Sequence, residues 1–179
     1  MELDLNPRIL NLLTRQLYKV AASPPEGVTP VINEENLAEI QADITGPEAT
    51  PYYGGTFRVK LELPSDFPTS PPKGYFLTKI WHPNISPGGE ICVNTLKKDW
   101  NPKAFSLFTI YQVIRCLLVE PFPASALNEE AGRMFMEDYR NYFQHAQLYT
   151  SIHAMPKKKL VKVPKVQTHL EKLKKWLRR

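Results

Sequence analysis

Four short strand-like segments follow one another in the first half of the chain, joined by short connections. They cover residues 28–32, 38–45, 56–63 and 74–78, and turn residues separate them. Parallel neighbours need a crossover of a dozen or more residues, usually a helix, whereas antiparallel neighbours need only a turn. The short connections therefore predict a four-stranded antiparallel meander rather than a series of βαβ units.

Helical patterns stand on both sides of the predicted sheet. Residues 6–22 repeat apolar side chains at helical spacing, and Ser23-Pro24-Pro25 ends the pattern. Residues 106–119 are apolar almost all round, which predicts a central helix, and residues 127–152 predict a further helical pair. We therefore expect an α+β fold with an N-terminal helix, the meander and C-terminal helices.

Residues 80–103 lack periodicity and are rich in Pro, Gly and Asn, which predicts a long irregular loop. A loop of this length inside a compact domain is usually functional. The candidate active site is therefore sought in this segment.

The formal net charge of +5 hides an uneven distribution. Residues 155–179 hold ten Lys and Arg against one Glu, whereas residues 1–154 hold 13 basic and 17 acidic residues. We predict a folded domain over residues 1–154 and a basic, mostly flexible tail over residues 155–179. Such a tail implies an acidic partner, which is a protein surface, nucleic acid or an anionic membrane.

Several classes of protein are disfavoured by composition. No run of about 18 apolar residues is present, so no membrane span is expected, and the N-terminus lacks the pattern of a secretory signal. Cys92 and Cys116 are therefore expected to be reduced thiols in the cytoplasm or nucleus. Two cysteines without His at ligand spacing do not build a zinc cluster, so no metal is expected.

Cys92 is the candidate nucleophile of the long loop. A lone cysteine is weak support, because free cysteines are commonly buried in cores. Cys92, however, follows Pro87-Gly88-Gly89, which predicts a tight exposed turn, and reactive thiols need exposure. No positioned His base is evident, as a cysteine hydrolase would require, so hydrolysis is disfavoured.

Asn84 stands eight residues before Cys92 and suits a different chemistry. A thioester is already activated toward amines, so strong base catalysis is not needed. The site must orient the amine, help it lose a proton and stabilise an oxyanion, for which an Asn side-chain N–H is a suitable donor. The loop thus favours amine transfer from a thioester.

An ordered set of short motifs runs through the chain. These are Gly46-Pro47, Thr50-Pro51-Tyr52, Gly54-Gly55, Phe57, Phe67-Pro68, Pro71-Pro72, His82-Pro83-Asn84, Gly89-x-Ile91-Cys92, Trp100-x-Pro102 and Pro121-x-Pro123. In this order the set resembles the ubiquitin-conjugating enzyme family over about residues 6–153. The resemblance implies that Cys92 accepts ubiquitin from the activating enzyme as a thioester and passes it to a lysine. It implies no bound cofactor, because the upstream activating enzyme uses the ATP.

The resemblance also implies roles for the other loop residues. Asn84 is implied to be an oxyanion donor or a residue that organises the loop. His82 is implied to brace the loop rather than to react, and Pro83 and Trp100 are implied to be architectural.

Two helical surfaces carry further implied contacts. Arg8, Arg15 and Lys19 resemble the face that docks on the activating enzyme, and a solvated helix face would look the same. Cys116 matches a position that contacts the donor ubiquitin. From the residues alone we expect Cys116 to be a small buried side chain that packs rather than reacts.

Three positions depart from the generalist members of the family. Thr69 replaces an aromatic residue that docks on RING ligases, and Ala124-Ser125 replace an acidic residue that orients the incoming lysine. Asn94 replaces an acid two residues after the nucleophile. Ordinary RING docking and attack by an arbitrary lysine are therefore in doubt.

The departures occur beside three longer strings, at residues 72–80, 89–94 and 125–132. All three resemble the branch that partners the anaphase-promoting complex and elongates lysine-eleven-linked ubiquitin chains. In that branch Glu129 holds the acceptor ubiquitin, whose own carboxylate completes a site that has only Ser125. A carboxylate at a helix start, favoured by the helix dipole, is the equally good plain interpretation of Glu129.

That branch ends in a basic, Leu/Arg-rich peptide that docks on the ligase. The corresponding ending here is Trp176, Leu177, Arg178 and Arg179, without a final Leu. A tail that binds nucleic acid or membrane is the less favoured alternative.

Three other functions stay open at this point. The chain can be a generalist ubiquitin carrier, or a carrier of another ubiquitin-like modifier. In a different class, it can be a non-catalytic adaptor that only binds ubiquitin. The intact Cys92 argues against the adaptor, because inactive relatives lack the nucleophile.

Overall fold

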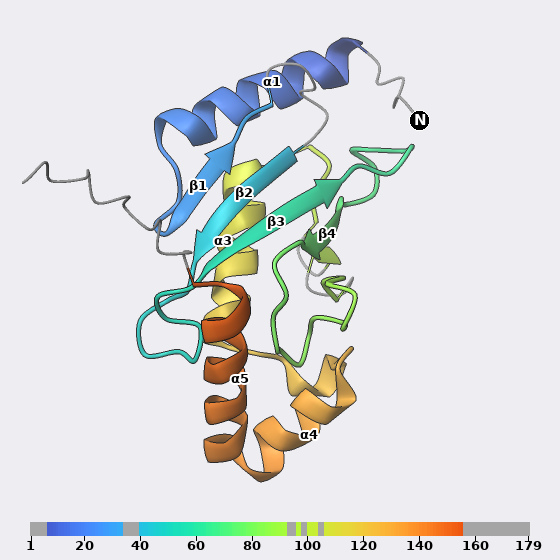
Figure 1. The fold of residues 1–179 in the computed structure, drawn as a ribbon. Coiled ribbons are helices and arrows are strands. Elements are labelled where there is room, and N and C mark those ends of the chain that lie inside the picture. The colour runs from blue at the N-terminus through green and yellow to red at the C-terminus, as the bar shows by residue number, and fades with distance from the viewer. Residues whose placement is uncertain (1–6, 34–39, 93–95, 98–99, 104–105, 156–179) are drawn as a thin grey trace, which may run out of the picture.

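The computed structural model describes residues 7–33, 40–92, 96–97, 100–103 and 106–155. It has the predicted α+β architecture of an N-terminal helix, an antiparallel sheet, a long loop and C-terminal helices (Figure 1). In chain order the elements are α1 (Pro7–Ala22), β1 (Val28–Val31), β2 (Ile40–Thr45), β3 (Thr56–Glu62), β4 (Lys73–Phe76), α3 (Leu107–Val119), the 3-10 turn η1 (Pro123–Ser125), α4 (Glu129–Glu137) and α5 (Tyr139–His153).

The sheet is the predicted meander, with the order β1-β2-β3-β4 and antiparallel pairing throughout. Side chains of β2 alternate, so that Ile40, Ala42 and Ile44 are fully buried while the residues between them are partly exposed. A shift of one residue would turn these three side chains to solvent, so burial sets the register. The fourth strand ends at Phe76 rather than Thr78, because Leu77 leaves the ladder and donates its N–H to Arg58 (2.8 Å).

Helix α3 lies against one face of the sheet (Figure 1) and contacts α1. Its core-facing side chains are Leu107, Ile110, Tyr111, Ile114, Leu117 and Leu118. The expected all-round burial is wrong along one stripe, where Gln112, Cys116 and Val119 are exposed. These residues recur at helical spacing on the face turned away from the core, so Cys116 is an exposed thiol and not the buried one expected.

Helices α4 and α5 form the predicted C-terminal pair, and the single residue Asp138 separates them. Helix α5 is fixed to the rest of the domain through Tyr142, whose hydroxyl lies 2.6 Å from that of Tyr52. Tyr52 in turn donates to the carbonyl oxygen of Trp81 (2.8 Å), immediately before His82. The C-terminal helix is therefore tied to the start of the long loop.

The described part of the domain is packed as far as Ala154. Ala154 is buried, and its carbonyl oxygen accepts the N–H of Thr56 at the start of β3 (2.8 Å). The domain boundary at residue 154 stays a prediction, because residues 156–179 are outside the described part. Trp176, Leu177, Arg178 and Arg179 therefore have no structural account here, and neither has Asn94.

Within the described residues, no helix combines the length and apolarity that crossing a membrane requires. The same residues contain no cluster of three or more His, Cys, Asp or Glu side chains suited to a metal ion.

Candidate active site

A tight turn at Ser86–Gly89 brings the long loop back to the sheet. The N–H of Gly89 donates to Ser86 (2.8 Å), and the carbonyl oxygen of Gly89 accepts the N–H of Phe76 (2.8 Å). Gly89 has a φ of +93°, and a Cβ there would lie 2.2 Å from the Phe76 carbonyl oxygen. Only glycine fits this approach, so the residue type at position 89 determines how the segment leading to Cys92 meets β4.

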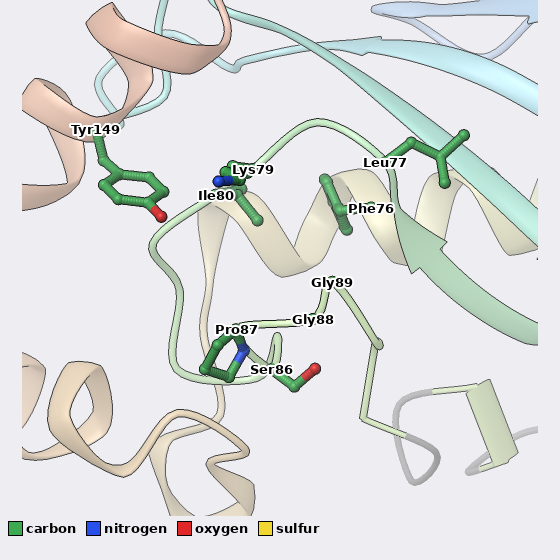
Figure 2. A pocket seen from close by; sticks show the side chains of 9 residues that line it. All are labelled: Phe76, Leu77, Lys79, Ile80, Ser86, Pro87, Gly88, Gly89 and Tyr149. Carbon is green, nitrogen blue, oxygen red and sulfur yellow. The ribbon is translucent and has the colours of Figure 1, made fainter.

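A pocket of about 170 Å³ lies between this turn and the chain after β4. Figure 2 shows Tyr149 of α5 on one side, near Lys79 and Ile80, and the turn residues Ser86 to Gly89 on the other. Its lining residues do not include His82, Asn84 or Cys92. The pocket therefore adjoins the catalytic candidates but is not formed by them.

Cys92 is buried, with 5% of its surface exposed, so the expectation of an exposed thiol is wrong. The turn before it is exposed at Pro87 and Gly88, but the chain then re-enters the core. Ile91 donates its N–H to Gly74 (2.9 Å) and is 2% exposed, and Cys92 follows it directly. The N–H of Cys92 donates to the carbonyl oxygen of Asn84 (2.9 Å), which joins the two candidate residues.

The Asn84 side chain is fully buried and bound to residues 121–128, here called the strap. Its Nδ2 donates to the carbonyl oxygens of Phe122 (2.6 Å) and Ser125 (3.1 Å). Its Oδ1 accepts the N–H of Phe122 (2.8 Å). Both amide hydrogens are thus engaged, so Asn84 organises the loop in this structure, and donation to an oxyanion would require giving up one of these bonds.

Pro83 makes the second connection between the loop and the strap. Its carbonyl oxygen accepts the N–H groups of Leu127 (2.8 Å) and Asn128 (2.9 Å). The strap leads into α4, so these bonds fix the start of that helix to the His82-Pro83-Asn84 segment.

His82 is completely buried at the base of the loop. Its Nε2 lies 2.9 Å from the carbonyl oxygen of Leu117, and its Nδ1 accepts the N–H of Asn84 (3.0 Å). An accepting Nδ1 and a donating Nε2 describe the neutral ring. Burial lowers the pKa of His82 to about 4, although the bond to Leu117 acts in the opposite direction. A neutral His82 therefore connects α3 to the loop.

Trp100 lies elsewhere, beside the turn that carries Thr69. Its indole N–H donates to the carbonyl oxygens of Pro68 (3.0 Å) and Thr69 (3.2 Å), and its ring packs near Phe67. Thr69 itself is exposed. Trp100 thus supports a surface turn.

The remaining predicted residues lie on the surface around this centre. Ser125 is partly buried in the strap, and Glu129 is exposed at the first position of α4. On α1, Arg8, Arg15 and Lys19 are all exposed. The structure thus joins Cys92, Asn84, His82, Pro83 and Ser125 into one bonded unit, with the docking residues outside it.

Two connecting residues were missed in the sequence. Phe122 uses both of its backbone polar groups on Asn84, and Asn128 caps α4 by accepting the N–H of Ala131 (3.1 Å). The Asn128 signal was present, since Asn followed by Glu-Glu at the start of a helical pattern indicates an N-cap. No local signal identifies Phe122.

The fold and these motifs agree with a known family. A family model described as ubiquitin-conjugating enzyme matches residues 12–150. The chain belongs to the ubiquitin-conjugating enzyme family. The matched range includes the sheet, the long loop with Cys92, and the C-terminal helices almost to their end.

Named relatives of this ubiquitin-conjugating domain are similar along most of the chain. Ubiquitin-conjugating enzyme E2 22 of Arabidopsis thaliana is 56% identical over 156 residues, which are 87% of this chain and 62% of the plant protein. Ubiquitin-conjugating enzyme E2 S of Drosophila melanogaster is 53% identical over 155 residues, covering 87% of this chain and 74% of the fly protein. The chain thus spans less than two thirds of the plant relative.

A solved Plasmodium yoelii structure described as a ubiquitin conjugating enzyme has a TM-score of 0.76 and 33% sequence identity. The match covers 86% of this chain and 99% of the solved one. Both the sequence and the backbone therefore support the same family and its fold.

The His82 environment predicts a pH dependence of stability. Below pH 6.5 the unfolded chain takes up a proton at His82 that the folded domain takes up only near pH 4. As the pH decreases from 6.5 to 4, the contribution of His82 to the free energy of unfolding therefore decreases by about 3 kcal/mol. Urea unfolding across this range should show the loss in the wild type and its absence from His82→Gln. Equal pH slopes in the two proteins would contradict the assignment.

The Asn84 contacts predict that an isosteric change is severe. Asn84→Asp replaces a donor to two carbonyl oxygens by a buried carboxylate, which should cost about 3–5 kcal/mol in free energy of unfolding. Asn101→Asp is the matched control, because exposed Asn101 only accepts, from Lys103, and Asp still accepts. Chemical denaturation measures both, and a small loss at Asn84 would mean that its amide is not bound to the strap.

Proposed function

We propose that Cys92 carries ubiquitin as a thioester and that the chain transfers it to a lysine amine. The observation that carries this proposal is the bond from the Cys92 N–H to the Asn84 carbonyl oxygen, within a loop whose other members match the family's motifs. ATP is used upstream by the activating enzyme, so the proposal requires no cofactor or metal on this chain.

The proposed step is an acyl transfer. The unprotonated amine attacks the thioester carbonyl carbon, a C–N bond forms, the C–S bond breaks, and Cys92 leaves as a thiolate. The amine's proton passes to solvent or to a group of the acceptor, since Ser125 is uncharged. Rate enhancement rests on orientation of the amine more than on acid–base strength.

Asn84 supports this step chiefly by shaping the site. Its amide binds the strap, which contains Ser125 and leads to Glu129. Contact with the oxyanion becomes available to Asn84 only when a strap carbonyl oxygen gives up its hydrogen bond. The organising role is therefore the one that the geometry supports, and oxyanion stabilisation is secondary.

We further propose that the acceptor is another ubiquitin, and that the new bond forms at the lysine that is its eleventh residue. The absence of an acid at Ser125 leaves an arbitrary lysine without a group that favours its free amine. Exposed Glu129, at the start of α4, is proposed to hold the acceptor ubiquitin so that its own carboxylate supplies that group. The three branch-specific strings and the similarity to E2 S and E2 22 proteins support this proposal.

The proposed partners fit the distribution of charge along the chain. The basic face formed by Arg8, Arg15 and Lys19 is proposed to dock on the activating enzyme. The tail, with a net charge of +9, is proposed to dock on a ligase, the anaphase-promoting complex, and to raise the local concentration of the enzyme there. Action with this ligase implies a location in the cytoplasm and nucleus.

The test of the thioester uses the two cysteines of the chain. With activating enzyme, ATP and ubiquitin, the wild type and Cys116→Ala should form a reductant-sensitive adduct, and Cys92→Ala should form none. Gel analysis with and without reductant measures the adduct. An adduct on Cys92→Ala would refute the assignment, and charging only by another ubiquitin-like modifier would change the substrate.

The linkage test compares ubiquitins that each retain one lysine. Chains should grow on the ubiquitin whose single lysine is its eleventh residue. Glu129→Ala should raise the KM for that acceptor ubiquitin up to about fivefold, as expected for an exposed ion pair. Glu130→Ala is the matched control, because Glu130 is exposed in the same helical turn. Equal growth on every single-lysine ubiquitin would remove the branch assignment.

A further inference from the structure

Asn128 is a buried polar residue to which the proposed chemistry assigns no role. It is 8% exposed, and as the last residue of the strap it directly precedes α4. Its backbone N–H donates to the Pro83 carbonyl oxygen (2.9 Å), while its Oδ1 accepts the N–H of Ala131 (3.1 Å). Its own carbonyl oxygen accepts the N–H of Gly132 (2.9 Å). One residue therefore bonds to the catalytic loop on one side and to the first turn of α4 on the other.

The first turn of α4 is also packed closely from the inside. Ala131 is fully buried, and a Cβ at Gly132 would lie 2.8 Å from the Cβ of Ala126 in the strap. Glu129 and Glu130 occupy the exposed side of the same turn. The direction in which these carboxylates point thus depends on how this turn is held.

Only two hydrogen bonds separate Glu129 from Cys92. Glu129 adjoins Asn128, which bonds to Pro83, and Asn84, next to Pro83, accepts the N–H of Cys92 (2.9 Å). The start of α4 and the nucleophile are thus connected by a short bonded path.

We propose that Asn128 is a positioning residue for the acceptor, and that its side chain fixes the helix start from which Glu129 acts. The inference rests on the proposed function, in which Glu129 holds the acceptor ubiquitin. Removing an N-cap side chain frees the first turn of a helix. Asn128→Ala keeps the backbone bond to Pro83, so the change is confined to the turn that carries Glu129, and Cys92 is left in place.

The experiment follows discharge of the Cys92 thioester at increasing concentrations of acceptor ubiquitin. Asn128→Ala should raise the KM for the acceptor up to about fivefold, which matches a typical N-cap loss and does not exceed the effect of removing Glu129 itself. Its kcat and its rate of charging should stay at the wild-type values. Asn128→Ser should restore the KM, because Ser caps helices about as well as Asn.

Asp138→Ala is the matched control variant. Asp138 caps α5 in the same manner, by accepting the N–H of Asn141 (3.1 Å), but it lies at the opposite end of α4 from Pro83. Its removal should leave the acceptor KM unchanged. An equal rise in KM for Asp138→Ala would show that general loosening of the helices is responsible, and would overturn the inference.

A double variant tests whether Asn128 acts through Glu129. If it does, Asn128→Ala should change the KM little in a Glu129→Ala background, because the group that it positions is gone. Additive effects of the two substitutions on the KM would overturn the inference while leaving the proposed function intact. An unchanged KM in Asn128→Ala, with a normal rate of charging, would do the same. Absence of any thioester on the wild type would instead overturn the proposed function together with it.

Discussion

The buried amide of Asn84 holds together the two segments from which the candidate site is built. One segment is the long loop that contains Cys92, and the other is the strap that precedes α4. They are nearly 40 residues apart in sequence, so their meeting depends on tertiary contacts alone. Because the amide is fully buried, a lost partner would leave an unsatisfied polar group, and the arrangement is correspondingly specific.

Much of the fold could be predicted from the sequence because it depends on local patterns. Alternating burial in β2 and short connections determine the meander, and Pro and Gly mark where the elements end. The separation of the last helical segment into α4 and α5 at Asp138 was predicted as a pair but not at this residue. Asp138 caps α5 with its side chain, a short-range signal that the apolar pattern alone does not contain.

The structure brings together most of the loop residues that the sequence singled out, but their environments were predicted less well. Exposure of Cys92 was inferred from the Gly-rich turn before it, yet pairing of Ile91 with Gly74 draws the cysteine into the core. Burial of Cys116 was inferred from its residue type, yet its stripe of α3 faces away from the core. The partners of Asn84 also could not be predicted, since an amide's bonds depend on what the fold brings to it and not on neighbouring residues.

Asp138 is the only residue between α4 and α5, and this brevity has a mechanical consequence. A helix on a long linker can move independently, whereas here Asp138 is both the C-cap of α4 and the N-cap of α5. Helix α5 is itself anchored by Tyr142 and Tyr52 to the chain just before His82. Both ends of α4 are thus connected to the same loop, at Pro83 and just before His82, so the position of the helix as a whole depends on the conformation of that loop.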